Sequence, residues 1–189
     1  MTKQLTLADY QRAAEMLGCR RQVIQAVAQV EAVNSGFLPS GRVAILFEAH
    51  VFSRLTGHRY DASHPSISSK TWDRGLYRGG EAEYPRLETA LQLDPEAALQ
   101  ATSWGVFQVM GFNAVKAGFA NVQHMAFAMQ EKEQRHLDAF VGFIRSEGLG
   151  ETLMRGDFDA FAQGYNGPRY AENRYPQRMR AALARLMQS

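Results

Sequence analysis

The hydrophobic residues of one short segment repeat at the spacing of a helix face, and a glutamate shares that face. The apolar members of the face are Val23, Ile24, Val27 and Val30. Glu31 lies on the same face near the helix end, because the helix-breaking residues 34–36, Asn-Ser-Gly, follow it. Desolvation against aliphatic side chains and the negative end of the helix dipole both favour the protonated carboxyl group. Glu31 is therefore a candidate general acid, and the alternative is a glutamate that extends from the helix end into water.

Helical patterns cover most of the remaining chain, with one short strand. Thr6 and Asp9 form a capping-box pattern before an apolar stripe that Gly18 ends, and this first helix is predicted to pack beside the Glu31 helix. Further patterns predict helices over residues 84–91, 95–101, 122–129, 137–144, 158–165 and 176–186. The compact apolar run 43–47 is interpreted as a buried strand, and the alternative is the first turn of a helix that continues to Leu55.

Residues 56–80 are rich in glycine and polar side chains and have little helical period. The aromatic members of this segment are Tyr60, Trp72 and Tyr77. Such a long segment is typical of a cleft wall with a small hairpin, and its aromatic rings would stack on sugar rings while polar neighbours bind hydroxyl groups. We do not predict a metal site from His58, Asp61 and His64, because spacing within a loop does not make side chains converge.

The composition indicates one globular domain, which we expect to span residues 1–189. Of the 189 residues, 46% are hydrophobic and 21% charged. The N-terminus has no apolar segment of the kind found in signal peptides, and no apolar run reaches the length of a membrane span. Cys19 is the only cysteine, which excludes an intrachain disulfide and favours synthesis in the cytosol.

The charge is concentrated at one end of the chain. The net charge of +2 is too small to argue for nucleic-acid binding, and we expect none. Five arginines against one glutamate give the last 21 residues a net charge of +4 and leave −2 for the rest. The basic end predicts contact with an acidic surface, and the alternative is a solvated helix face.

Three landmarks follow one another in a familiar order: Glu31 at a helix end, Gly105-x-x-Gln108 after a short helix, and Tyr165-Asn166 at another helix end. This order resembles the lysozyme-like superfamily, especially goose-type lysozymes and lytic transglycosylases. The chain is more similar still to phage endolysins of the N-acetylmuramidase family. Four blocks carry the similarity: AVAQVEAVNSGF (26–37), GRVAILFEAHVFSRLTG (41–57), SWGVFQVMGFN (103–113) and GYNGPRYAENRY (164–175).

The resemblance implies an α+β, mainly α-helical, lysozyme-like domain with a small β element beside the active-site cleft. It implies an enzyme that cleaves the β-1,4 bond between N-acetylmuramic acid and N-acetylglucosamine in peptidoglycan, with Glu31 as the proton donor. The implied substrate-binding residues are Gln108, Tyr165, Asn166, Ser103 and, in the cleft wall, Tyr60. For each of these side chains the alternative is local bonding or packing within the protein.

A second carboxylate would decide how the bond is broken. Glu48 is the candidate, because it follows the apolar run 43–47 and would activate a water molecule as a base. A salt bridge with Arg42 or Arg54 is the alternative explanation of a glutamate at this position. Without a base, a lytic transglycosylase lets the muramoyl C6 hydroxyl attack, and a non-catalytic glycan-binding domain is the alternative from another class. Ala32 departs from the serine that often follows the acid in similar sequences, which removes one hydroxyl partner.

The setting is also implied by the resemblance. We expect no cofactor and no metal, and a monomer whose substrate is the glycan strand of peptidoglycan. A bacteriophage enzyme of this kind would be made in the host cytoplasm without a signal peptide and would lyse the periplasmic cell wall after release, as an antimicrobial endolysin. We further expect contact between the basic C-terminal helix and the anionic envelope, and no separate peptidoglycan-binding module.

Overall fold

The computed structural model describes residues 3–32, 35–166 and 174–188 and is mainly helical. The helices are α1 (Leu7–Leu17), α2 (Arg21–Glu31), α3 (Ala49–Leu55), α4 (Glu83–Leu93), α5 (Pro95–Gln100), α6 (Val122–Ala128), α7 (Glu133–Ser146), α8 (Gly150–Met154), α9 (Phe158–Asn166) and α10 (Tyr175–Leu186). Short 3₁₀ turns are η1 (Arg74–Leu76), η2 (Gly80–Ala82) and η3 (Gly111–Asn113). The predicted fold class, mainly α-helical with a small β element, is confirmed.

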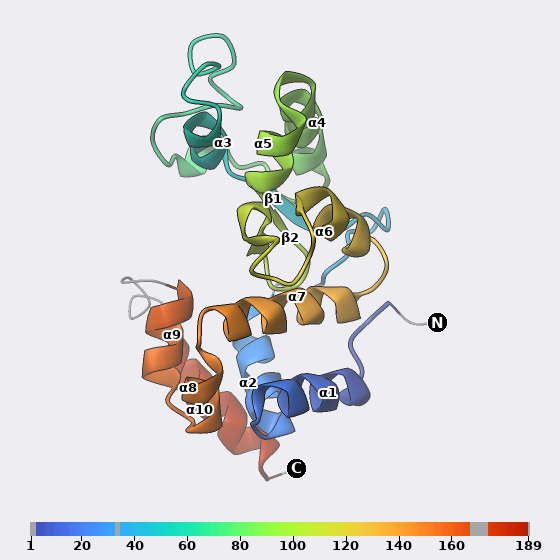
Figure 1. Cartoon of the computed structure of the whole chain (residues 1–189), viewed down its shortest axis with the longest axis vertical. Coiled ribbons are helices and arrows are strands. Elements are labelled where there is room, and N and C mark those ends of the chain that lie inside the picture. Colours follow the sequence, from blue (N-terminus) through green and yellow to red (C-terminus); the bar gives the residue numbers. More distant parts are fainter. Residues whose placement is uncertain (1–2, 33–34, 167–173, 189) are drawn as a thin grey trace.

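Two lobes meet at a narrow waist (Figure 1). The upper lobe holds α3, α4 and α5 above the small sheet, and the lower lobe holds α1, α2, α8, α9 and α10. Helix α7 runs across the molecule at the junction, while α2 packs against both α1 and α10. Within the described ranges, no helix combines the length and the apolar character that crossing a membrane requires.

The sheet has three antiparallel strands in the order β1-β2-β3, with β1 at Ile45–Phe47, β2 at Thr102–Trp104 and β3 at Val109–Met110. Ile45 pairs with Trp104, and Trp104 pairs with Val109. The strand predicted within 43–47 is confirmed, and a separate helix follows it. The hairpin suggested for residues 56–80 is wrong: this segment forms turns and 3₁₀ helix, and the hairpin lies at 102–110 instead.

The predicted helix signals formed the expected caps. Thr6 and Asp9 form a reciprocal capping box at the start of α1, and Gly18 ends that helix in the left-handed conformation with φ 67°. Asp94 accepts a hydrogen bond from the Ala97 N–H at the start of α5, where Pro95 opens the helix. The predicted apolar stripe of α1 included Leu7, which was wrong, since Leu7 is 60% exposed. Helix α8 was not predicted, because five residues give too short a pattern.

The core is centred on the apolar face of α7. Leu137, Phe140 and Ile144 of this helix are fully buried, and the Phe140 ring stacks on Phe107 at a centroid distance of 4.4 Å. Phe107 belongs to the turn between β2 and β3, so α7 supports that turn from below. The same helix therefore joins the core of the molecule to the waist, where the two lobes face each other.

Candidate active site

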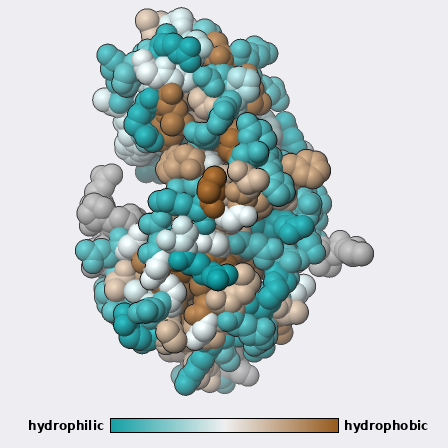
Figure 2. Space-filling model, viewed as in Figure 1, coloured by the Kyte–Doolittle hydropathy of each residue, from teal (hydrophilic) through white to brown (hydrophobic). Residues whose placement is uncertain are grey.

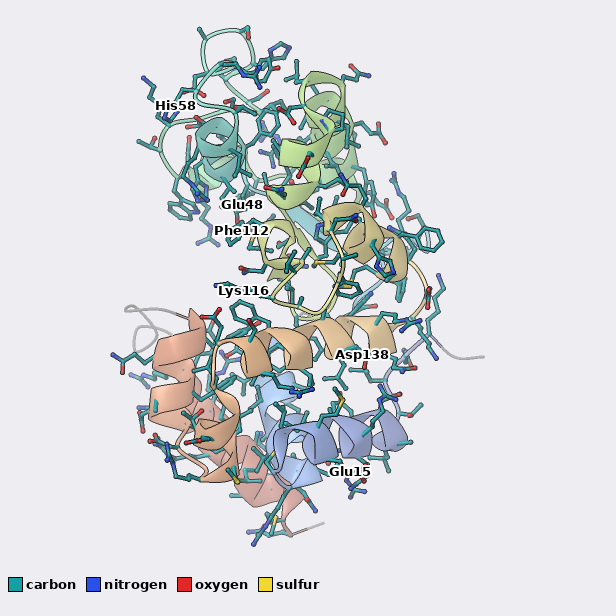
Figure 3. All side chains as sticks on the ribbon, in the orientation of Figure 1. Glu15, Glu48, His58, Phe112, Lys116 and Asp138 are labelled. Carbon is teal, nitrogen blue, oxygen red and sulfur yellow. The ribbon has the colours of Figure 1, made fainter. Side chains whose placement is uncertain are left out.

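A cleft of about 570 Å³ lies between the lobes and gathers side chains from both. Glu31 comes from α2 in the lower lobe, and Glu48 comes from the segment between β1 and α3 in the upper lobe. Gln108 and Tyr165 also line it. The space-filling view is hollowed at the waist (Figure 2), and Glu48 and Phe112 lie on the upper side of this opening (Figure 3). Four of the predicted site residues are thus brought to one cleft.

Glu31 is the last residue of α2 and is half-buried. The helix buries Ile24 and Val27 completely and Val30 in part, so the predicted apolar face is confirmed. The helix then ends at Ala32, whose backbone is extended and whose N–H still donates to the Ala28 carbonyl. Glu31 at this helix end is one of the residues that line the cleft.

Tyr165 faces Glu31 from α9 and is held by aromatic neighbours. Its ring stacks on Phe161 at 5.6 Å and meets the edges of Phe140 and Phe143 at 5.2 and 5.9 Å. Its hydroxyl donates to the Phe107 carbonyl at 3.3 Å. Burial raises the pKa of Tyr165 above its usual value. The tyrosine therefore stays protonated. Its ring packs with the aromatic residues around it and also forms part of the cleft wall.

Gln108 has its amide largely satisfied within the protein. It adopts a left-handed backbone with φ 49°, and its Nε2 donates to the carbonyls of Gly105 at 2.8 Å and Ala44 at 3.3 Å. Its Oε1 accepts from the hydroxyl of Ser103 at 2.8 Å. Ser103 is only 4% exposed, so it lies behind Gln108 and fixes its orientation. The amide carbonyl keeps one acceptor site that can meet a ligand in the cleft.

His136 is a buried residue of this site that the sequence interpretation missed. Its ring Nδ1 accepts from the Val106 N–H at 3.2 Å, and Nε2 lies 2.7 Å from the Met129 carbonyl, which makes Nε2 the protonated nitrogen. Burial lowers the pKa of this imidazole, so the ring is neutral. The helical spacing from His136 to Phe140 and Val141 on the buried face of α7 was the available signal.

The turn that carries Gln108 depends on a glycine beside this imidazole. Gly105 has φ 73°, and a Cβ at this position would lie 2.6 Å from the Cγ of His136. We expect Gly105→Ala to lower the free energy of unfolding by about 1–3 kcal/mol more than Gly57→Ala does. Gly57 is the matched control, because it has a similar φ of 61° with no atom within 4 Å of an added Cβ. Chemical denaturation measures both variants, and equal losses would mean that only backbone strain matters at position 105.

Glu48 has partners different from those predicted. Its Oε2 accepts from the Tyr77 hydroxyl at 2.5 Å and lies 3.3 Å from Nδ1 of His50. The alternative of a salt bridge with Arg42 or Arg54 is wrong. Arg42 pairs with Glu81 at 2.5 Å, and the Arg54 guanidinium lies over the Phe112 ring at 5.9 Å. Glu48 is therefore a carboxylate held at the cleft by Tyr77 and His50, with a side chain 16% exposed.

Other predicted residues lie apart from the cleft lining. Tyr60 stacks on Phe52 and donates to the Leu93 carbonyl at 2.9 Å, and in the described part of the chain it is not one of the lining residues. Among the residues described, no three His, Cys, Asp or Glu side chains are grouped as metal ligands. Asn166 is the last residue of α9, and its side chain lies outside the described structure. Asn113, Phe143 and Tyr175 also line the cleft and were not predicted to do so.

Comparisons with known proteins agree with this arrangement. A family model described as Muramidase, N-acetylmuramidase, matches residues 20–187, so the chain belongs to the N-acetylmuramidase family. The crystal structure of the Burkholderia AP3 phage endolysin is similar at a TM-score of 0.93 and 37% identity. The match covers 99% of this chain and 73% of that one. No match was found among curated proteins. The family and the neighbour identify the chain as a peptidoglycan-degrading glycoside hydrolase of the endolysin type.

Proposed function

We propose that this muramidase hydrolyses the β-1,4 bond after N-acetylmuramic acid with Glu31 as general acid and Glu48 as general base. The observation that supports the proposal is the placement of two carboxyl groups, from different lobes, in one cleft of about 570 Å³. A pair of carboxyl groups on either side of the bond is what glycoside hydrolysis requires. The alternatives without catalysis do not explain why a second carboxylate is held at the cleft by Tyr77.

The proposed reaction has two proton transfers, one from Glu31 to the leaving oxygen and one from the attacking water to Glu48. Glu31 donates its proton to the glycosidic oxygen as the bond to the muramoyl C1 breaks, so that N-acetylglucosamine leaves as an alcohol. Water adds to C1 from the opposite face, and Glu48 takes the proton that the water loses. The half-buried helix end beside Val27 and the ring of Tyr165 would keep Glu31 protonated before the reaction. We infer that Gln108, Tyr165 and Asn166 orient the sugar, with Ser103 acting through Gln108.

Purified peptidoglycan tests the activity directly. The protein should reduce the turbidity of a peptidoglycan suspension and release new reducing ends at the same rate. Binding without loss of turbidity would indicate a glycan-binding domain instead of an enzyme. Loss of turbidity without new reducing ends would indicate a lytic transglycosylase, because a 1,6-anhydro product has no free reducing end.

The basic C-terminal helix is proposed to contact the anionic envelope. Replacing Arg178, Arg180 and Arg185 with Gln should weaken binding to whole cells at low salt, with less effect on soluble glycan, because screened charge attraction is lost. Part of this charge is already neutralised, since Arg180 pairs with Asp159 on α9. Arg169 of the same basic stretch lies outside the described residues.

A control with the same loss of charge is available on the other lobe. Its substitutions are Arg59→Gln, Lys70→Gln and Arg74→Gln, all at exposed positions. Sedimentation with cells at two salt concentrations measures the binding of both triple variants. Equal weakening by the two would mean that net charge, rather than this helix, drives the contact.

The setting follows the same proposal. We propose that the enzyme acts as a monomer in the periplasm after synthesis in the host cytoplasm. One catalytic domain over residues 1–189 stays a prediction.

A further inference from the structure

We propose that Tyr77 and His50 are positioning residues that hold one oxygen of Glu48 and leave the other to receive the proton of the attacking water. The inference rests on the proposed role of Glu48 as the base and goes beyond it, because it names what fixes the base. Both side chains contact Oε2 of Glu48. The Tyr77 hydroxyl donates to this oxygen at 2.5 Å, and the Nδ1 of His50 lies 3.3 Å from it. Among the described residues, Oε1 accepts no hydrogen bond, so it is the oxygen available to water.

A buried ion pair fixes Tyr77 and Glu48 relative to each other. Glu83 on α4 is fully buried and binds both chain segments. Its Oε1 accepts from the N–H groups of Arg78 at 2.6 Å and Gly79 at 2.9 Å, directly after Tyr77. Its Oε2 accepts from the Phe47 N–H at 3.3 Å, directly before Glu48. One carboxylate thus sets the spacing between the tyrosine and the base.

Arg86, on the same helix, is the partner of Glu83 in this ion pair. Its Nη1 donates to Glu83 at 2.6 Å and to the Phe47 carbonyl at 3.0 Å, so both polar backbone groups of Phe47 are bound. Burial would raise the pKa of Glu83, but the amides of Gly79 and Arg78 and the charge of Arg86 outweigh it and lower the pKa. The pair therefore stays ionised. Within the described residues the buried Nε of Arg86 has no partner, but the other hydrogen bonds of the pair rigidify the segments that they join.

Tyr77 acts as a donor that does not lose its proton. Burial raises the pKa of its phenol well above the usual value, and the hydrogen bond and charge of Glu48 raise it further. The Trp72 ring lies against that of Tyr77 at a centroid distance of 6.2 Å, on the exposed side of the segment. A fixed neutral donor stabilises the carboxylate form of Glu48 without competing for the proton of the water. The water proton passes to Oε1, and Tyr77 keeps its own.

In the described part of the chain, four groups bear on the charge of Glu48. Tyr77 and His50 contact Glu48 directly, and Glu31 lines the same cleft. The positive charge of Arg86 acts on Tyr77, whose pKa it lowers slightly against the larger effect of burial. Loss of the Tyr77 hydroxyl removes a hydrogen bond that is stronger to the carboxylate form of Glu48 than to the neutral acid. Since the base has to be ionised in the free enzyme, the acidic limb of the kcat/KM profile must then move to higher pH.

The test is the pH profile of Tyr77→Phe. We expect the acidic limb to move to higher pH and kcat to fall about tenfold, with KM nearly unchanged. The matched control is Tyr84→Phe, which also loses one hydroxyl bond, to the Val43 carbonyl at 2.8 Å, but is not a lining residue of the described cleft. Tyr84→Phe should leave the limb in place. If Tyr77→Phe does not fold, His50→Gln carries the same test, with a smaller shift in the same direction.

A double variant separates this inference from the proposed function. In the Glu48→Gln background, Tyr77→Phe should cause no further loss, because the group that it positions is gone. Independent losses, or an unmoved acidic limb in Tyr77→Phe, would overturn the positioning role while leaving Glu48 as the base. A fully active Glu48→Gln would instead overturn the base itself, and with it both proposals.

Discussion

Glu31→Gln is expected to fold normally and to lose at least roughly 10²–10⁴-fold in the rate of peptidoglycan clearance. Glutamine is nearly isosteric with glutamate but has no acidic proton to give to the leaving oxygen. The substitution lies at the last position of α2, after the buried residues Val27 and Ala28, so it removes none of the apolar packing that holds the helix. Turbidity clearance measures the loss, and circular dichroism with a thermal melt checks the fold.

The control for this variant is Glu15→Gln, which makes the same chemical change on α1, away from the cleft (Figure 3). Glu15 accepts a bond from Gln11 one turn earlier on an exposed helix face, so the fold and the activity should be kept. A folded Glu31→Gln with clearance close to that of Glu15→Gln would exclude Glu31 as the acid. The cleft would then need another donor, and the muramidase family would stand without this assignment.

The sequence was sufficient for the parts of the fold that depend on local pattern. Caps at Thr6, Asp94 and Asp157 formed because each side chain accepts from a backbone N–H in the first helical turn, a signal contained within four residues. Glu31 could be found in the same way, since its helical face and the breaker after it are adjacent in the chain. The cleft residues Gln108 and Tyr165 came from the family resemblance and not from periodicity.

What the sequence could not supply are contacts between distant segments. The sequence near Glu48 does not indicate that Tyr77, 29 positions later, is its partner. Loop 56–80 has no regular period, so its path back to Glu48 cannot be predicted. An arginine close in sequence looked the more natural partner, but Arg42 is taken by Glu81. The 102–110 hairpin was missed for a related reason. Gly105 and Gln108 both need left-handed backbone there, and the glutamine gives no sequence signal for it.

Position 133, which does not line the described cleft, illustrates the same limit. Glu133 is 7% exposed in the first turn of α7, where a charged residue usually complements the helix dipole at the surface. In the structure its two oxygens accept from the N–H groups of Gly36 at 2.9 Å and Leu5 at 3.1 Å. It thereby ties the segment after Glu31 and the N-terminal segment to α7. The helical pattern predicts a solvent-exposed residue at this position. Its hydrogen bonds to two distant segments become evident only in the tertiary structure.

Glu48→Gln is expected to slow hydrolysis by roughly 10²-fold or more while the fold stays intact. The reason is that a glutamine at this position can still accept from Tyr77 through its carbonyl but cannot take a proton from water. Glu88→Gln is the matched control, because Glu88 is an exposed glutamate on α4 with a side chain 63% exposed. Release of reducing ends from purified peptidoglycan measures both variants, and an undiminished Glu48→Gln would remove this residue from the mechanism without affecting the case for Glu31.

The reaction products show which nucleophile attacks the muramoyl carbon, water or the C6 hydroxyl. If water attacks, mass spectrometry should find muropeptides that end in reducing N-acetylmuramic acid, since the water oxygen stays on C1. If the C6 hydroxyl of the same sugar attacks, the products are lighter by one water and end in 1,6-anhydro-muramic acid. Glu48 could accept the proton from either nucleophile, so a slow variant alone does not separate them. Anhydro products from the wild-type enzyme would overturn hydrolysis, whereas reducing N-acetylmuramic acid ends would identify water as the nucleophile at the muramoyl carbon, and their loss in Glu48→Gln would assign its activation to Glu48.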